Sequence, residues 1–138
     1  MASTTVRIKR VYEPREKADG CRVLVDRLWP RGLTREKAAI GRWLKELGPS
    51  TELRQWFDHR AERWQEFAKR YRRELAGPAA RPLLKELAAM AAAGPLTLVF
   101  SAHDEAHNQA VVIAQVLRAR LGRAKRPAAK AARASTKG

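Results

Sequence analysis

The sequence predicts an α/β fold: a small Rossmann-like, three-layer domain with a short, mainly parallel sheet and about five helices. Three observations support this. Strand-like runs occur at Val6–Tyr12, Arg22–Asp26 and Leu96–Ser101. Apolar residues recur at helical spacing between the second and third runs, and again after the third. Because strands separated by helices pair through right-handed crossovers, we expect the strands to be parallel.

The three strands have different patterns. Val6 and Ile8 alternate with charged residues, which is typical of a half-buried strand. The other two runs are almost continuously apolar, which indicates strands buried on both faces. Pro30 and Gly32 predict a loop after the second strand.

Capping and stop signals separate the helices. The first helix is predicted from the helical spacing of Ile40, Trp43, Leu44 and Leu47. In chain order we expect a helix capped by Thr34 and stopped by Gly48-Pro49, a short one capped by Ser50, one over 61–76, one with Pro82 in its first turn and Gly94 at its end, and one that ends at Gly122.

Charge divides the chain into two parts. The net charge is +15, and residues 118–138 hold eight of the 29 basic residues and no acid. We expect residues 1–122 to form a single domain and residues 123–138 to form a disordered basic tail, because this tail has no apolar residue larger than alanine. The candidate nucleic-acid contacts in the tail are Arg123, Lys125, Arg126, Lys130, Arg133 and Lys137. The alternative is a solubilising tail without a dedicated partner.

Composition excludes several classes of protein. No apolar run reaches the ~20 residues that cross a bilayer, so no membrane partner is expected. The N-terminus lacks the apolar core of a secretory signal, which predicts a cytoplasmic protein. The single cysteine, Cys21, excludes an internal disulfide and is interpreted as structural. No phosphate-loop, dinucleotide or Cys-x-x-Cys motif is present, so the sequence identifies no cofactor, and no metal is expected.

Two loops follow the buried strands and form the predicted site. They are Asp26–Gly32 and Ser101–Asn108. Ligands of parallel sheets bind beyond the carboxyl ends of the strands, so we expect these loops to be neighbours although they are far apart in the chain.

The first loop combines one carboxylate with two guanidinium groups. Arg27 and Arg31 are the predicted contacts of an anionic group, since arginine binds phosphate and carboxylate in a bidentate way. Asp26 either acts as a base or orients an arginine, and the alternative is an Asp–Arg pair that only fixes the loop. Trp29 either stacks on a ligand or belongs to the core, and Gly32 completes the candidate ligand-binding set in this loop.

The second loop offers acid–base groups. His103, Asp104 and His107 are, with Asp26, the candidate catalytic residues, and Ser101 and Asn108 are candidate ligand contacts. The alternative is that Asp104 caps the following helix and the histidines are solvated. Arg70 and Tyr71 form a third candidate, which either reaches the cleft or belongs to an ordinary helix face.

Several runs carry a resemblance to a known family. They are Arg10–Pro14, Asp19-Gly20, Leu24–Gly32, Trp43–Leu47, Pro49-Ser50, Leu53–His59, Trp64–Phe67, Arg70-Tyr71, Ala102–Asp104 and His107–Ala110. The chain over 6–121 resembles the YeaO-like branch of the bacterial domain-of-unknown-function family numbered 488. The resemblance implies a compact α/β fold and no established activity. A longer branch is similar at both loops but has a Cys-His-Arg run where this chain has Asn108, Gln109 and Ala110, so cysteine chemistry is not expected.

Two functions are therefore considered. The first is a small enzyme or binding domain for an anionic, nucleotide-like or phosphorylated small molecule at the two loops. The second is a nucleic-acid-associated protein that binds non-specifically through its tail. A weaker third is a protein-interaction module that uses Trp56, Phe57 or Trp64, but these aromatic residues fit helix faces.

Overall fold

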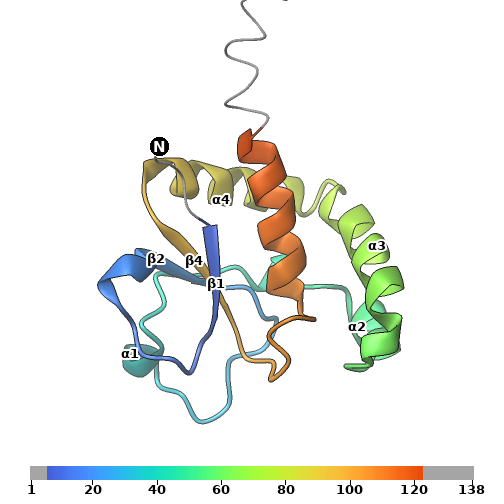
Figure 1. Cartoon of the computed structure of the whole chain (residues 1–138), viewed down its shortest axis with the longest axis horizontal. Coiled ribbons are helices and arrows are strands. Elements are labelled where there is room, and N and C mark those ends of the chain that lie inside the picture. The colour runs from blue at the N-terminus through green and yellow to red at the C-terminus, as the bar shows by residue number, and fades with distance from the viewer. Residues whose placement is uncertain (1–5, 123–138) are drawn as a thin grey trace, which may run out of the picture.

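The computed structural model describes residues 6–122, and Figure 1 shows its elements. In chain order they are β1 (Val6–Arg10), η1 (Lys17–Asp19), β2 (Cys21–Leu24), α1 (Arg35–Ala38), β3 (Arg42–Trp43), η2 (Lys45–Leu47), α2 (Thr51–Phe57), η3 (Ala61–Arg63), α3 (Trp64–Leu75), α4 (Arg81–Ala93), β4 (Leu96–Phe100) and a last helix over 109–122. The basic tail predicted for 123–138 lies outside these residues.

The four strands form one parallel sheet in the order β1-β4-β2-β3. β4 is central, and its Leu96 pairs with Val6 of β1 and with Cys21 of β2. All carboxyl ends therefore lie at one edge of the sheet. With five α-helices in residues 6–122, the predicted α/β fold with a parallel sheet is confirmed.

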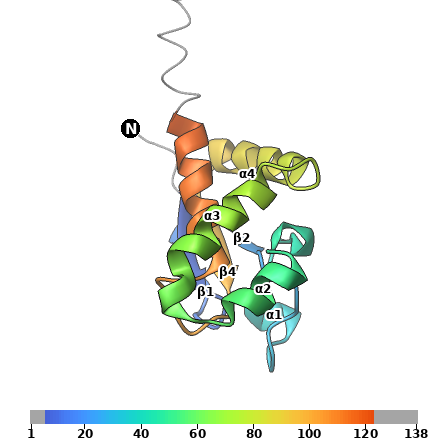
Figure 2. The ribbon, with the colours of Figure 1, turned by 90° about the vertical axis from the view of Figure 1, so that its right-hand side faces the viewer.

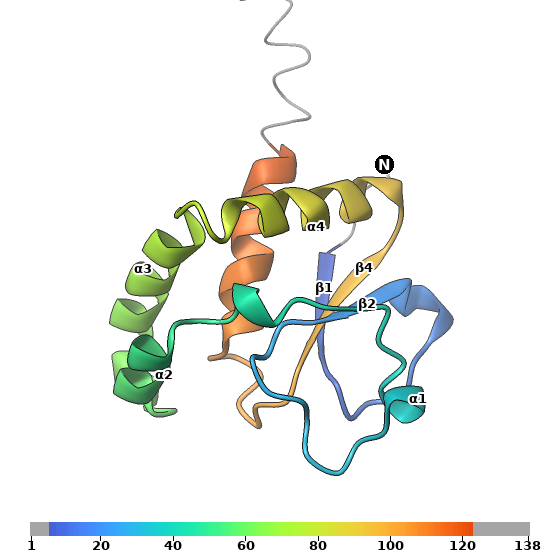
Figure 3. The same cartoon turned by 180° about the vertical axis from the view of Figure 1, so that it is seen from behind.

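The two faces of the sheet carry separate cores. Leu98 and Phe100 of β4 pack into the main core with α2, α3, α4 and the last helix, whereas Val99 between them packs into a smaller core with Leu24 and Ala38. In Figure 2, α3 lies in front of β1 and β4, and α4 runs above it. Figures 1 and 3 show α1 on the opposite side of the molecule from α2 and α3.

The helix expected from Thr34 to Gly48 was wrong. Thr34 does cap a helix, with its Oγ1 accepting from the N–H of Lys37 at 3.1 Å, but α1 ends after four residues because Ala39 is left-handed at φ 52°. The chain then forms β3, whose Trp43 pairs with Leu24. The apolar residues that suggested one helix are divided between the two cores: Ile40 and Trp43 pack in the smaller one, and Leu44 and Leu47 in the main one.

Other expected helix signals are confirmed. The Oγ of Ser50 caps α2 by accepting from the N–H of Leu53 at 3.2 Å, Pro82 lies in the first turn of α4, and Gly94 is its C-cap. Within residues 6–122, no helix is long and apolar enough to cross a membrane.

A buried ionic cluster lies under the loop before β2. The carboxylate of Asp19 accepts from Lys9 Nζ at 3.1 Å and from Arg22 Nη1 at 3.2 Å, and the side chains of Asp19 and Arg22 are fully buried. Arg22 also donates to the carbonyls of Val11, Glu13 and Ala38. These bonds join β1, β2 and α1, so we interpret the cluster as structural.

Candidate functional site

A pocket of about 570 Å³ lies at the carboxyl edge of the sheet. Both predicted loops line it, so they are neighbours as expected. Its lining residues come from the ends of the strands, from α2 and α3 and from the start of the last helix: Arg10, Tyr12, Asp26, Arg27, Leu28, Trp29, Pro30, Arg31, Pro49, Arg54, Phe57, His59, Phe67, Ser101, Ala102, His103, His107, Asn108 and Gln109.

Asp26 joins the two loops inside the pocket. Its Oδ2 accepts from the backbone N–H of Ser101 at 2.9 Å and from the Ser101 hydroxyl at 2.6 Å, and its Oδ1 accepts from Gln109 Nε2. The residue is 9% exposed, and burial raises the pKa of its carboxyl although the hydrogen bonds from Ser101 and Gln109 oppose this. Both oxygens are occupied, so the carboxylate holds the pocket together.

Two of the four arginines that line the pocket donate hydrogen bonds to backbone carbonyls. Arg10 donates to the carbonyls of Ser101 and Ala102, each at 2.9 Å. Arg27 donates to the carbonyls of Pro49 at 2.7 Å and Gly48 at 3.0 Å. These guanidinium groups fix the loops and still contribute positive charge to the pocket.

The other two arginines are exposed at the pocket. Arg31 comes from the loop after β2 and Arg54 from α2. Neither guanidinium group has a hydrogen bond or ion pair with residues 6–122. All of their donors are therefore available for an anion.

The turn before the last helix satisfies its own backbone. Asp104 Oδ1 accepts from the N–H groups of Ala106 and His107 at 2.9 and 3.1 Å, and Asn108 Oδ1 accepts from the N–H of Val111 at 3.2 Å. The helix is thus capped by Asn108, and Asp104 caps the turn before it. The N–H groups that we expected to attract an anion are partly occupied by these side chains.

Asp104 and Trp64 both contact the ring of His107 and fix its orientation. Its Nδ1 lies 2.9 Å from Asp104 Oδ2, and its ring meets the edge of Trp64 at 5.1 Å between centroids. The hydrogen bond with His107 lowers the pKa of Asp104, helped by the backbone N–H of Ala106. Asp104 itself does not line the pocket.

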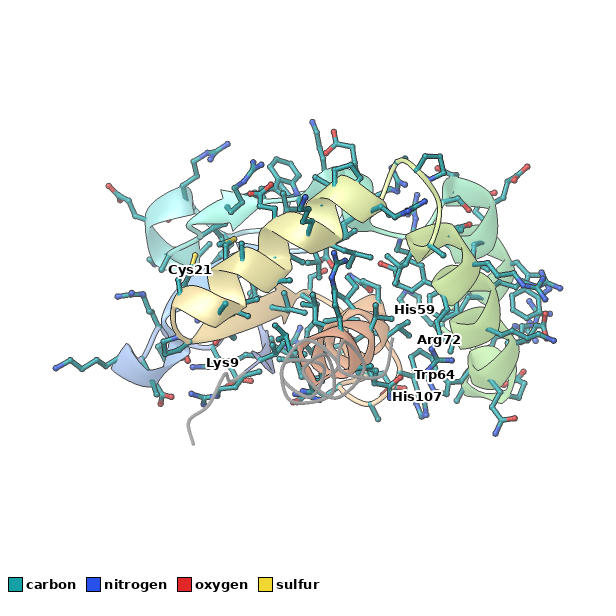
Figure 4. All side chains as sticks on the ribbon, turned by 90° about the horizontal axis from the view of Figure 1, so that it is seen from above. Lys9, Cys21, His59, Trp64, Arg72 and His107 are labelled. Carbon is teal, nitrogen blue, oxygen red and sulfur yellow. The ribbon has the colours of Figure 1, made fainter. Side chains whose placement is uncertain are left out.

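All three histidines of the chain line this one pocket. Figure 4 shows His59, Trp64 and His107 near one another between α3 and the last helix, with Cys21 at the other end of the molecule. His59 has a left-handed backbone at φ 55°, and His103 is exposed. No group of three or more histidine, cysteine or acidic side chains among residues 6–122 is arranged to hold a metal ion.

Several predicted contacts lie outside the pocket. Tyr71 is fully buried and donates from its hydroxyl to the carbonyl of Leu47 at 2.6 Å. Arg70 pairs with Glu66 at 2.8 Å and lies over the Trp56 ring. Gly32 does not line the pocket, and the predicted nucleic-acid contacts at 123–137 lie beyond the described residues.

Trp29 belongs both to the pocket and to the smaller core. Its Nε1 donates to the carbonyl of Leu33 at 2.6 Å, its ring meets Trp43 edge-on at 5.3 Å, and Arg35 lies over it. Its position is therefore fixed by the protein.

Sequence reasoning missed five of the polar residues in the pocket. They are Arg10, Tyr12, Arg54, His59 and Gln109. Arg10 had a signal, because it ends a strand whose carboxyl edge was predicted to hold the site. Arg54 and His59 lie in the run Leu53–His59 that carries the family resemblance, but no local pattern placed them at the pocket.

Comparison with known proteins agrees with the predicted family. The model of the family DUF488-N3i, described as the inactive DUF488-N3 subclade, matches residues 5–136. The chain belongs to this family.

Similar proteins occur in Mycobacterium tuberculosis and in Escherichia coli. "Uncharacterized protein Rv3073c" of Mycobacterium tuberculosis is 43% identical over 85% of this chain and 97% of its own length. "Uncharacterized protein YeaO" of Escherichia coli is 44% identical over 82% and 96%. The expected likeness to the YeaO-like branch is confirmed. No solved structure matches the chain.

Proposed function

We propose that this DUF488-N3i domain binds an anionic small molecule, nucleotide-like or phosphorylated, at the carboxyl edge of its sheet. The observation that carries the proposal is the charge of the pocket. Four arginines line it against one carboxylate, that of Asp26. Such an excess of guanidinium groups favours phosphate or carboxylate ligands.

The four arginines differ in their contacts, and this difference supports the proposal. Arg10 and Arg27 bind backbone carbonyls and supply a fixed positive potential, whereas Arg31 and Arg54 line the pocket with donors available. The rings of Phe57 and Phe67 line the same pocket and favour a flat or apolar ligand body.

Binding without turnover fits this site better than catalysis. Asp26 has both oxygens occupied, and the chain has Asn108 where a longer branch has a cysteine. The family is also described as inactive. The catalytic roles considered for Asp26, His103, Asp104 and His107 stay predictions, and a binding role needs none of them.

Isothermal titration calorimetry tests the proposal with a panel of nucleoside monophosphates and sugar phosphates against the matching uncharged compounds. We expect only phosphorylated compounds to bind. Arg31→Gln or Arg54→Gln should weaken binding about 10- to 100-fold, since each removes a charge-assisted hydrogen bond. Arg73→Gln, an exposed arginine of α3 outside the pocket, is the matched control. Absence of binding by every phosphorylated compound would contradict the proposal.

The basic segment 123–138 supports a second, separate proposal. Its six Lys and Arg residues and lack of acids favour non-specific, salt-sensitive binding of nucleic acid. Deletion of residues 123–138 should abolish retention on DNA–cellulose at low salt, and retention that survives the deletion would exclude the tail as the cause.

A further inference from the structure

The hydrogen bonds around Asp26 determine which atoms the inner pocket presents. A carboxylate only accepts hydrogen bonds, so the amide of Gln109 must direct its Nε2 to Asp26 and its Oε1 elsewhere. The Oε1 has no partner among residues 6–122, and Gln109 lines the pocket. The side chain therefore offers a fixed acceptor to a ligand.

Ser101 is constrained in the same way. Its hydroxyl hydrogen points to Asp26 Oδ2 over 2.6 Å, so the oxygen keeps only acceptor positions for a ligand. Around the buried carboxylate the pocket thus presents two acceptors, Gln109 Oε1 and Ser101 Oγ, next to a negative charge. A ligand edge placed here must donate hydrogen bonds.

The outer pocket has the opposite character. Arg31, Arg54, His59 and His103 line it and are exposed, and both arginines have donors available. A ligand group placed here must be an anion or an acceptor. The ring of Phe57 also lines the pocket, on the same helix as Arg54 and stacked on Phe67 at 4.3 Å between centroids.

We infer that the pocket binds its ligand in one orientation, with a donor-bearing ring edge against Gln109 and Ser101 and a phosphate at the mouth beside Arg31 and Arg54. The ligand class is a purine nucleoside monophosphate whose base carries an amino group. This inference rests on the proposed function and deepens it, because the charge excess alone selects an anion but neither a donor edge nor an orientation.

Two matched pairs of ligands test the inference on the full-length protein. Adenosine 5′-monophosphate is compared with purine riboside 5′-monophosphate, and guanosine 5′-monophosphate with inosine 5′-monophosphate, so that each second member lacks one amino group. In titration calorimetry we expect at least one amino-bearing member to bind about 3- to 10-fold more tightly than its partner, which corresponds to one neutral hydrogen bond.

Two variants test which residue causes the preference for the amino-bearing nucleotide. Gln109→Met keeps the length of the side chain and removes one of the two acceptors, so the preference for the amino-bearing member of a pair should become smaller. Arg54→Gln should weaken both members of a pair and preserve the ratio between them. Melting temperatures of both variants verify that they are folded.

The possible results distinguish failure of the proposed function from failure of this inference alone. If no phosphorylated compound binds, the proposed function fails. If phosphorylated compounds bind but no amino-bearing purine nucleotide exceeds its partner, this inference is overturned and the proposed function stands. A preference that is undiminished in Gln109→Met also overturns it, because the amino group then makes no hydrogen bond with Gln109.

Discussion

Asp26 and Ser101, 75 residues apart in the chain, are joined by two hydrogen bonds to a single carboxylate oxygen. Asp26 follows β2 and Ser101 follows β4, so these bonds tie adjacent strands together immediately beyond their carboxyl ends. Both residues line the pocket, which therefore lies beside these hydrogen bonds.

Loss of this carboxylate should destabilise the protein. Asp26→Ala leaves the Ser101 N–H, the Ser101 hydroxyl and the Gln109 amide without their acceptor, and we expect the free energy of unfolding to fall by about 1–3 kcal/mol. Urea denaturation measures this. Glu105→Ala in the same region, at an exposed residue, should change it by less than about 0.5 kcal/mol. Equal stabilities of the two variants would show that the tie is unimportant.

Tyr71 should matter for stability and not for binding. Tyr71→Phe removes the hydroxyl that donates to the buried carbonyl of Leu47, at an expected cost of about 1–3 kcal/mol in urea denaturation. Nucleotide affinity should remain within about twofold of the wild-type value, because Tyr71 does not line the pocket. The exposed hydroxyl of Tyr12 provides the comparison: Tyr12→Phe should cost less than about 0.5 kcal/mol. A large loss of affinity in Tyr71→Phe would show that Tyr71 contributes to ligand binding.

The sequence predicted which loops are neighbours better than it predicted the elements beside them. Parallel pairing follows from the order of strands and helices, and it brings Asp26 and Ser101 to one edge without further information. The strand β3 was missed because Trp43 falls at helical spacing with Ile40 and Leu47, and the end of the helix depends on Ala39 adopting a left-handed backbone. Arg54 and His59 were missed because helix packing, which a single sequence does not encode locally, brings them to the pocket.

The pair of Asp104 and His107 should be visible in a titration. The hydrogen bond with His107 lowers the pKa of Asp104, so the His107→Ala variant should show this pKa raised toward its ordinary value. Carboxyl-detected NMR measures it residue by residue. The backbone hydrogen bonds from Ala106 and residue 107 remain, so the increase should be partial. His59→Ala is the control and should leave the pKa of Asp104 unchanged.

The ionic cluster at Asp19 should contribute to stability at neutral pH and lose that contribution in acid. Burial raises the pKa of Asp19, but the hydrogen bonds from the N–H of Glu16, from Lys9 and from Arg22 lower it by more. A carboxyl with a lowered folded pKa stabilises the protein above its unfolded pKa, and this stabilisation disappears as the pH falls through the folded pKa.

Asp19→Asn tests that linkage. We expect a loss of about 3–5 kcal/mol at pH 7, since Arg22 stays buried without its counter-charge, and a smaller decrease of stability with acidification than in the wild type. Asp58→Asn, in an exposed pair with Arg60 at 3.9 Å, should cost no more than about 1 kcal/mol. Urea denaturation at several pH values gives both quantities. Parallel pH profiles for wild type and Asp19→Asn would contradict the linkage.

Gly20 should tolerate no side chain, because it precedes β2 where the chain passes over Pro95. Its φ is 63°, and a Cβ there would lie 2.3 Å from the Pro95 carbonyl oxygen. Gly20→Ala should therefore cost at least about 3 kcal/mol, from backbone strain and overpacking together. Gly32 separates the two causes, since its φ is 73° but no atom lies within 4 Å of its Cβ position. Gly32→Ala should cost about 1 kcal/mol, from strain alone. Thermal and urea denaturation of the two variants measure the difference, and equal losses would mean that the contact with Pro95 does not limit position 20.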